Sequence, residues 1–344
     1  MKLFNVLAVS FILVLFSLTL NAQTSGYRIA NKFHLDGDEG WDMIAVDDAS
    51  GRIFESHGSM VQVVDEATGT LLGTIGNLSG VHGIAFANDQ NKGFISCGRD
   101  SSATVFDLKT LAVTDKISMT GKNADAIVYD GFTHRVFVFN GGSNNATVVD
   151  ASSDAVIGTV SLSGRPEFGV SDGKGKVYIN IEDKSMIDVI NSTTMQVEQS
   201  WPLTPGEEPS GIALDNDNHI LFSACSNNLM VMTDALTGKT IATVPIGNRV
   251  DGADYDPVKK RAFAPSGEGS LAVIQEESKD KFTVFETVPT QKSARTIALD
   301  KKTHHIFLPA ADLEDPPPPT EENPHPRPKI KAGTFVILDV EPLK

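Results

Sequence analysis

The chain has 344 residues, a net charge of −15 and only two cysteines. The acidic balance argues against non-specific binding to nucleic acid or to an anionic membrane surface, because phosphates are bound by basic surfaces. Two cysteines in a chain of this length also exclude a disulfide scaffold.

The first predicted element is a secretory signal peptide over residues 1–22. Lys2 is followed by the apolar run LFNVLAVSFILVLFSLTL and then by NAQ, an order typical of a signal with its cleavage site. We expect cleavage after Ala22 and a single mature domain over residues 23–344 that is periplasmic or secreted. No later apolar run reaches the roughly 20 residues that a spanning helix needs. We therefore expect no membrane insertion after cleavage.

Seven similar segments then follow in chain order, and each has the pattern of a strand, a tight polar turn and a second strand. They are WDMIAVDDASGRIFES, VHGIAFANDQNKGFIS, ADAIVYDGFTHRVFVF, PEFGVSDGKGKVYINI, PSGIALDNDNHILFSA, VDGADYDPVKKRAFAP and ARTIALDKKTHHIFLP. A third strand that ends in an acidic or amide residue follows each segment, and a fourth strand usually follows that. The repeats are spaced by 40 to 44 residues. Four strands at this period predict an all-β fold, a seven-bladed β-propeller.

The two ends of the mature chain predict how the ring closes. The last repeat stops after its third strand, at GTFVILDVEPLK, whereas YRIANKFHL near the N-terminus resembles an isolated fourth strand. Pairing of these two segments would close the ring and remove the exposed strand edges that invite aggregation. We therefore expect the N-terminal strand to complete the last blade.

Blade seven carries a proline-rich insertion over about residues 311–332, between its second and third strands. The segment ADLEDPPPPTEENPHPRPKIKA makes this blade about 22 residues longer than the others. Its prolines exclude a regular strand and favour polyproline II. The sequence leaves two interpretations open, a disordered surface loop or a semi-rigid lid or partner-docking strut.

The repeats resemble the YVTN-repeat, or YncE-like, propellers of exported bacterial proteins. Blade four, KVYINIEDKSMIDVINSTTMQV, is similar to that family's strand–turn–strand pattern. ATVVDASSDAVIGTV and MVMTDALTGKTIATV are similar to its turn between the third and fourth strands. No blade contains the literal YVTN string. The resemblance implies the fold and an extracytoplasmic location, and it implies little about activity.

Candidate site residues come from the second position of each repeat, at the start of the strand that lines the channel. This inner ring consists of Asp42, His82, Asp125, Glu167, Ser210, Asp251 and Arg295. We predict that a ligand binds at this channel mouth. Converging carboxylates either raise one another's pKa or recruit a cation. The alternative is that they are solvated or paired with rim bases.

A second ring is predicted fifteen residues further on, at the end of each second strand. It contains His57, Cys97, Asn140, Glu182, Cys225, Ser266 and Ala310. Asn140 and Glu182 join the ligand-binding candidates. Asp42, His57, His82 and Cys97 form a candidate metal set, since their donor atoms suit zinc, copper or iron. The two cysteines are three blades apart, too far for a disulfide, so we predict two free thiols.

Three functions remain in competition. The favoured one is a monomeric, non-enzymatic protein that binds a small molecule or a protein at the channel mouth and does not bind nucleic acid. The second is a metal-dependent hydrolase similar to the propeller lactonases, with Glu167, Glu182, Asn140, Asp125 and Asp251 as ligands. The third is a periplasmic metal-binding or redox-partner protein that uses His57, His82 and Cys97. The cofactor is unknown, and a divalent metal ion is the candidate.

Overall fold

The structure is a computed structural model that describes residues 26–320, 326 and 328–343. The predicted signal peptide, residues 1–22, lies outside the described residues. Within them, no helix is long and apolar enough to cross a membrane.

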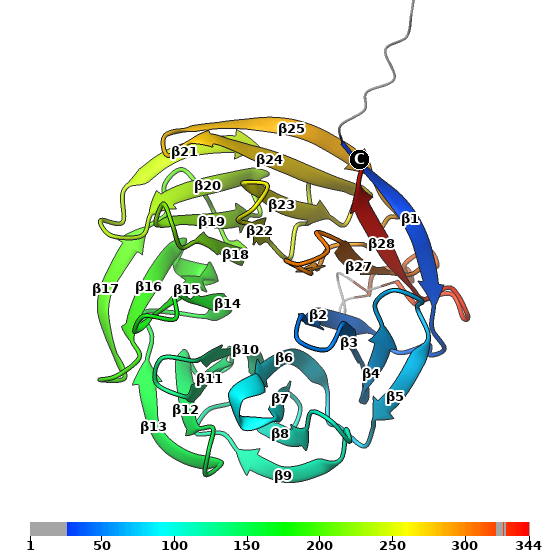
Figure 1. Cartoon of the computed structure of the whole chain (residues 1–344), viewed down its shortest axis with the longest axis horizontal. Helices are drawn as coiled ribbons and strands as arrows, with labels where there is room; N and C mark the ends of the chain where they lie inside the picture. The colour runs from blue at the N-terminus through cyan, green and yellow to red at the C-terminus, as the bar shows by residue number, and fades with distance from the viewer. Residues whose placement is uncertain (1–25, 321–325, 327, 344) are drawn as a thin grey trace, which may run out of the picture.

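Seven antiparallel four-stranded sheets form a ring around a central channel, as Figure 1 shows. Blades one to three consist of β2 (Trp41–Asp47), β3 (Arg52–His57), β4 (Met60–Asp65), β5 (Leu71–Ile75); β6 (Val81–Ala87), β7 (Lys92–Cys97), β8 (Ser102–Asp107), β9 (Val113–Ser118); and β10 (Ala124–Asp130), β11 (Arg135–Asn140), β12 (Asn145–Asp150), β13 (Ala155–Ser161). Blades four and five consist of β14 (Pro166–Ser171), β15 (Lys176–Ile181), β16 (Met186–Asn191), β17 (Gln196–Pro202); and β18 (Pro209–Asp215), β19 (Ile220–Cys225), β20 (Leu229–Asp234), β21 (Thr240–Pro245). Blade six consists of β22 (Asp254–Asp256), β23 (Arg261–Ser266), β24 (Ser270–Ser278) and β25 (Lys281–Pro289). Two short 3₁₀ helices, Asn88–Gln90 and Glu182–Lys184, lie in turns. The predicted seven-bladed propeller is confirmed.

Blade seven is built from both ends of the described chain. Its strands are β26 (Ala298–Leu299), β27 (Ile306–Ala310), β28 (Val336–Pro342) and β1 (Tyr27–His34). In Figure 1 the dark blue β1 runs along the outside of the dark red β28. The two strands pair in antiparallel register from Tyr27 opposite Pro342 to His34 opposite Val336. The predicted closure of the ring by the N-terminal strand is confirmed.

The core lies between adjacent blades, because each middle strand is buried on both faces. Large aromatic side chains fill these interfaces, including Phe54, Phe94, Phe137, Phe222 and Phe307, all fully buried. The fourth strands instead show exposed side chains over most of their length. Burial on both faces explains the Val-, Ile- and Phe-rich runs of the second and third strands.

The residue that ends each third strand holds the turn that follows. Asp107, for example, accepts hydrogen bonds from the backbone N–H of Lys109 and Thr110, at 3.0 and 2.8 Å, and from the Thr110 hydroxyl. Asp65, Asp150, Asn191 and Asp234 do the same in their blades. Such side-chain-to-backbone bonds are the reason for Asp and Asn in turns. They account for the periodic acidic and amide residues in the sequence.

Candidate functional site

In blades one to five, the inner-ring side chain sits at a register irregularity in the first strand. In blade one, Trp41 pairs with His57 and Ile44 pairs with Glu55, and the register shifts between them. The same shift occurs at the start of β6, β10, β14 and β18. A β-bulge re-aims the side chain of the extra residue. The residue just after the paired one, Asp42 in blade one, therefore turns toward the channel.

Hydrogen bonds between neighbouring blades fix the backbone at the mouth. The Thr296 hydroxyl donates to the Asp42 carbonyl at 2.7 Å, which joins blade seven to blade one. Ser96 of blade two donates to the carbonyl of Asp125 in blade three. Ser210 of blade five donates to the Val250 carbonyl at 3.1 Å. These three bonds tie neighbouring blades to one another at the mouth.

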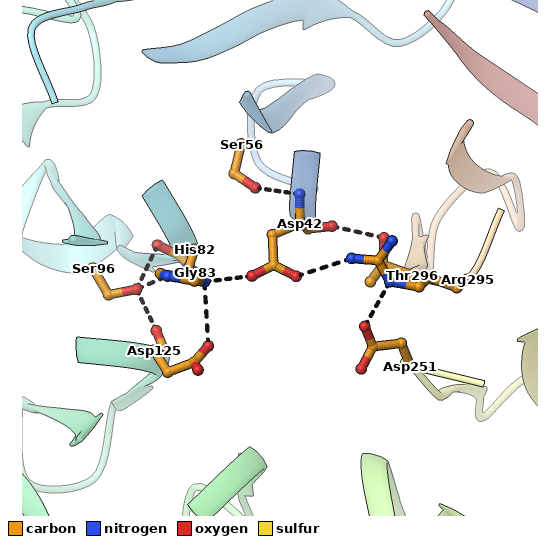
Figure 2. Close-up of polar contacts among 9 residues, drawn as sticks. All are labelled: Asp42, Ser56, His82, Gly83, Ser96, Asp125, Asp251, Arg295 and Thr296. Carbon is orange, nitrogen blue, oxygen red and sulfur yellow. Dashed lines mark hydrogen bonds and ion pairs between the residues drawn. The ribbon is translucent and has the colours of Figure 1, made fainter. Parts of the chain in front are cut away.

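Asp42, His82 and Asp125 converge on one point, as Figure 2 shows. The Nδ1 atom of His82 lies 2.5 Å from Asp42 Oδ2 and 3.5 Å from Asp125 Oδ1. Each residue offers one possible ligand atom, and these atoms lie within 4.8 Å of one another. Burial lowers the pKa of His82, but the hydrogen bond to Asp42 and the charges of Asp125 and Asp42 outweigh burial and raise it. The three side chains are 20 to 28% exposed, so a ligand in the mouth can reach them.

Arg295 forms the other half of the charge network. Its Nε lies 2.8 Å from Asp251 Oδ2, and its terminal nitrogen lies 3.9 Å from Asp42 Oδ1. Figure 2 shows Asp42 between the His82 and Asp125 pair on one side and the Arg295 and Asp251 pair on the other. Asp42 therefore links the His82–Asp125 pair to the Arg295–Asp251 pair, and a substitution of Asp42 removes a contact from both pairs.

The acids of the mouth are incompletely neutralised. Burial and the nearby charges of Asp125 and Asp251 raise the pKa of Glu167 to about 8. Burial raises the pKa of Asp125 to about 6, even though His82 opposes the shift. Arg165 lies 3.8 Å from Glu167, but it is also paired with Glu182. The mouth therefore disfavours the ionised forms of these acids, and a bound cation would stabilise those forms.

A further acid, Glu55, lies behind the mouth. It is fully buried on β3, and neither carboxylate oxygen has a hydrogen-bond partner among the described residues. Burial and the charge of Asp42 raise the pKa of Glu55 well above its usual range. Glu55 was not among the predicted site residues, because an acid in the strand RIFESH looks like an exposed position. The signal was its place opposite Ile44, inside the blade.

A cavity of about 620 Å³ lies at the channel mouth, and Glu55 is not part of its lining. Met43 and Phe168 lie in its wall and also line the narrower channel below, which has a volume of about 260 Å³. The cavity is within the range of small-molecule sites. Of the predicted inner ring, it brings together Asp42, His82, Asp125, Glu167, Asp251 and Arg295. Ser210 instead makes the backbone contact to Val250 and does not line this cavity.

The second predicted ring does not surround the mouth. Five of its members pair with the residue before the inner-ring position of their blade and are buried: His57, Cys97, Asn140, Cys225 and Ser266. Ala310 is also buried, whereas Glu182 lies at the rim. His57 is fully buried and is hydrogen-bonded to Gln62 and to the Glu39 carbonyl. Its ring packs against Phe335 in a tilted arrangement, with centroids 4.3 Å apart. Cys97 is fully buried in an apolar cluster. The metal set of Asp42, His57, His82 and Cys97 is therefore not assembled, because the bulge separates the two rings.

The hydrolase set is also only partly assembled. Asn140 is fully buried inside blade three, where it donates to Asn145 and Thr147. Glu182 is paired with Arg165 at the rim. Only Asp125, Glu167 and Asp251 of this set line the mouth. Cys97 and Cys225 are both free and buried, which confirms the two predicted free thiols.

Scans against models of known protein families and a search of curated proteins find no match. Solved structures do match. The structure titled U3-55K has a TM-score of 0.77 at 11% identity and covers 91% of this chain and 99% of its own. The structure of the RRP9 WD40 repeats has a TM-score of 0.76 at 9% identity, and the match covers 90% of this chain and 97% of that one. The structure of hydrazine synthase of Kuenenia stuttgartiensis has a TM-score of 0.68 at 14% identity, and the match covers 82% of this chain and 96% of that one. Likeness at such low identity shows the fold alone, and the chain is a seven-bladed β-propeller with WD40-like architecture.

Proposed function

We propose that the chain is an exported, non-enzymatic binding protein and that its channel mouth takes a divalent metal ion. The observation that carries this proposal is the convergence of donor atoms from Asp42, His82 and Asp125 within 4.8 Å. The three residues come from three different blades, and the inter-blade hydrogen bonds hold them in place. One imidazole and two carboxylates suit Zn²⁺ or Mn²⁺ better than Ca²⁺ or Mg²⁺, which prefer oxygen ligands alone.

The electrostatics of the mouth support a cation as the ligand. Burial raises the pKa of both Asp125 and Glu167, so their ionised forms are disfavoured when no cation is nearby. A bound metal ion would stabilise these ionised forms and lower both pKa values. It would also displace the proton of His82 and leave the ring nitrogen free to bind.

Calorimetric titration of chelator-treated protein with ZnCl₂, MnCl₂ and CaCl₂ tests the proposal. We expect one site per chain and weaker binding of Ca²⁺ than of Zn²⁺. Asp125→Asn and His82→Ala should each weaken Zn²⁺ binding by more than about 100-fold, because loss of an outer-shell partner alone weakens metal binding about 10- to 100-fold. Titration should show tighter binding at higher pH, since protons compete with the metal for these groups.

The matched control is His134→Ala. His134 also pairs with an aspartate, with Nδ1 2.7 Å from Asp89 Oδ2, but it lies in the turn after β10, on the opposite face. This variant should bind Zn²⁺ like the parent protein. Equal loss of binding in His134→Ala and His82→Ala, or no binding in the parent protein, contradicts the proposal.

The two alternative functions have less support. A lactonase-like hydrolase would need Asn140 and Glu182 at the metal, and these residues are respectively buried in blade three and paired with Arg165. A redox partner would need an accessible thiol, whereas Cys97 is fully buried and burial raises its pKa. Low thiolate content and low exposure make a cysteine inert.

The export part of the proposal rests on the signal-like N-terminus and on the likeness of blade four to YVTN repeats. We expect intact mass analysis of protein secreted from a bacterial host to give a chain that begins at Gln23. A product that stays in the cytoplasm and retains residues 1–22 contradicts it.

A further inference from the structure

A second cavity, of about 730 Å³, lies beside the mouth on the same face. It shares Trp41, Asp251 and Arg295 with the mouth cavity, and its other wall is formed by the ends of the proline-rich insertion, including Leu313 and Ile330. We call this cavity the side groove. Its volume is that of a typical small-molecule pocket.

The insertion forms a defined wall because its two ends pair with each other. Leu313 and Ile330 form an antiparallel bridge. The Glu314 N–H donates to the Lys329 carbonyl at 2.8 Å, and the Lys331 N–H donates to the Asp312 carbonyl at 2.8 Å. Leu313 and Ile330 also pack against the buried cluster that contains Trp41 and Phe335. Of the two interpretations of the insertion, the described ends therefore favour the semi-rigid one.

The charges of the side groove differ from those of the mouth. Three cations line it, Arg249, Arg295 and Lys329, with the carboxylates Asp38 and Asp251. Arg295 is already paired with Asp251. Asp38 accepts a hydrogen bond from the Gly333 N–H at 3.3 Å. Arg249 and Lys329 are exposed, and neither forms an ion pair within the described part of the chain. In a chain with net charge −15, the groove thus presents two cations that form no ion pair among the described residues, beside apolar walls.

We propose that the side groove binds a small organic anion, a carboxylate or phosphate that carries an aromatic or branched aliphatic body. The body would pack on Leu313, Ile330 and the Trp41 ring. The anionic group would lie between Arg249 and Lys329, since the guanidinium fork matches carboxylate and phosphate oxygens. This site is separate from the proposed metal site and needs no metal.

Calorimetric titration of metal-free mature protein, with EDTA present, tests the inference. The probes are 2-naphthoate and 2-naphthyl phosphate, and neutral 2-naphthamide is their uncharged counterpart. We expect at least one anion to bind with one site per chain and about tenfold more tightly than the amide. The double variant Arg249→Gln/Lys329→Gln should weaken the binding of that anion about tenfold, which corresponds to about 1.4 kcal/mol. Both positions are exposed, so the variant should keep the parent's unfolding midpoint.

The matched control is Arg99→Gln/Lys122→Gln, which removes the same charge from the same face outside the side groove. It should bind the probes like the parent protein, and so should Asp125→Asn, which removes only a proposed metal ligand. The inference is overturned if neither anion binds saturably, if the amide binds equally well, or if the control loses as much affinity as the groove variant. Absence of Zn²⁺ binding in the parent protein, with naphthoate binding present, would count against the metal site alone.

Discussion

Replacing Tyr27 and Phe33 together by alanine is expected to lower the free energy of unfolding by about 6 to 10 kcal/mol, because each buried aromatic truncation costs about 3 to 5 kcal/mol. Both residues lie on the closing strand β1 and are less than 10% exposed. Tyr27 packs edge-to-face on Phe263 of blade six, with ring centroids 5.4 Å apart. Phe33 lies directly against Gly69 of blade one. The two side chains thus fasten blade seven to both of its neighbours, and urea unfolding measures their effect.

The control for ring closure is Leu71→Ala/Val113→Ala. These residues also lie on fourth strands, β5 and β9, but they are 48 and 51% exposed. We expect a loss of no more than about 1 kcal/mol, the range of surface substitutions. If the β1 variant unfolds at the same urea concentration as this control, closure by β1 is not what stabilises the ring.

The architecture could be predicted from the sequence because its determinants are local and repeated. The turn residues Asp65, Asp107 and Asp150 mark the end of each third strand and hold the turn by short-range hydrogen bonds. The apolar runs follow from burial of the middle strands on both faces. A signal that recurs seven times at a period of 40 to 44 residues fixes the register of the blades.

The site could be predicted only in part, because the side-chain directions depend on the backbone irregularity. A one-residue shift in register turns a side chain to the other face of a sheet. The inner ring was placed at the mouth, but His57 and Cys97 were expected beside it and lie inside the blades. The bulge that causes this difference cannot be recognised from the residues of segments such as GWDMIA and GVHGIA. The burial of Glu55 is equally hard to predict, because it depends on the packing of β3 within the blade.

The acidic mouth is expected to make the metal-free protein less stable as the pH rises from about 5 to 9. A carboxyl group whose pKa is raised in the folded state contributes stability below its unfolded pKa, and this contribution is lost as the pH rises through the folded pKa. The folded pKa values are about 6 for Asp125 and about 8 for Glu167. The raised pKa of His82 acts in the same direction. On the opposite face, burial raises the pKa of Glu66 to about 8, so Glu66 also contributes to the change of stability with pH. Single variants of mouth residues are therefore needed to measure the contribution of the mouth.

Glu167→Gln is therefore expected to be more stable than the parent at pH 9, by about 2 to 3 kcal/mol, and nearly equal to it at pH 5. The exposed Glu314→Gln variant, with the same change of charge, should show neither effect. Urea unfolding at the two pH values measures the difference. If the free energy of unfolding increases equally at both pH values, ionisation of Glu167 does not destabilise the folded protein.

The same variant connects stability to binding. The repulsion that destabilises the ionised mouth is also what favours a cation there, so removal of the Glu167 charge should increase stability and reduce the benefit of a metal ion. In thermal unfolding at pH 8, Zn²⁺ should raise the midpoint of the parent protein more than that of Glu167→Gln, although the variant starts from the higher midpoint. An equal rise in both proteins would place the cation beyond the reach of Glu167 and restrict the metal site to Asp42, His82 and Asp125.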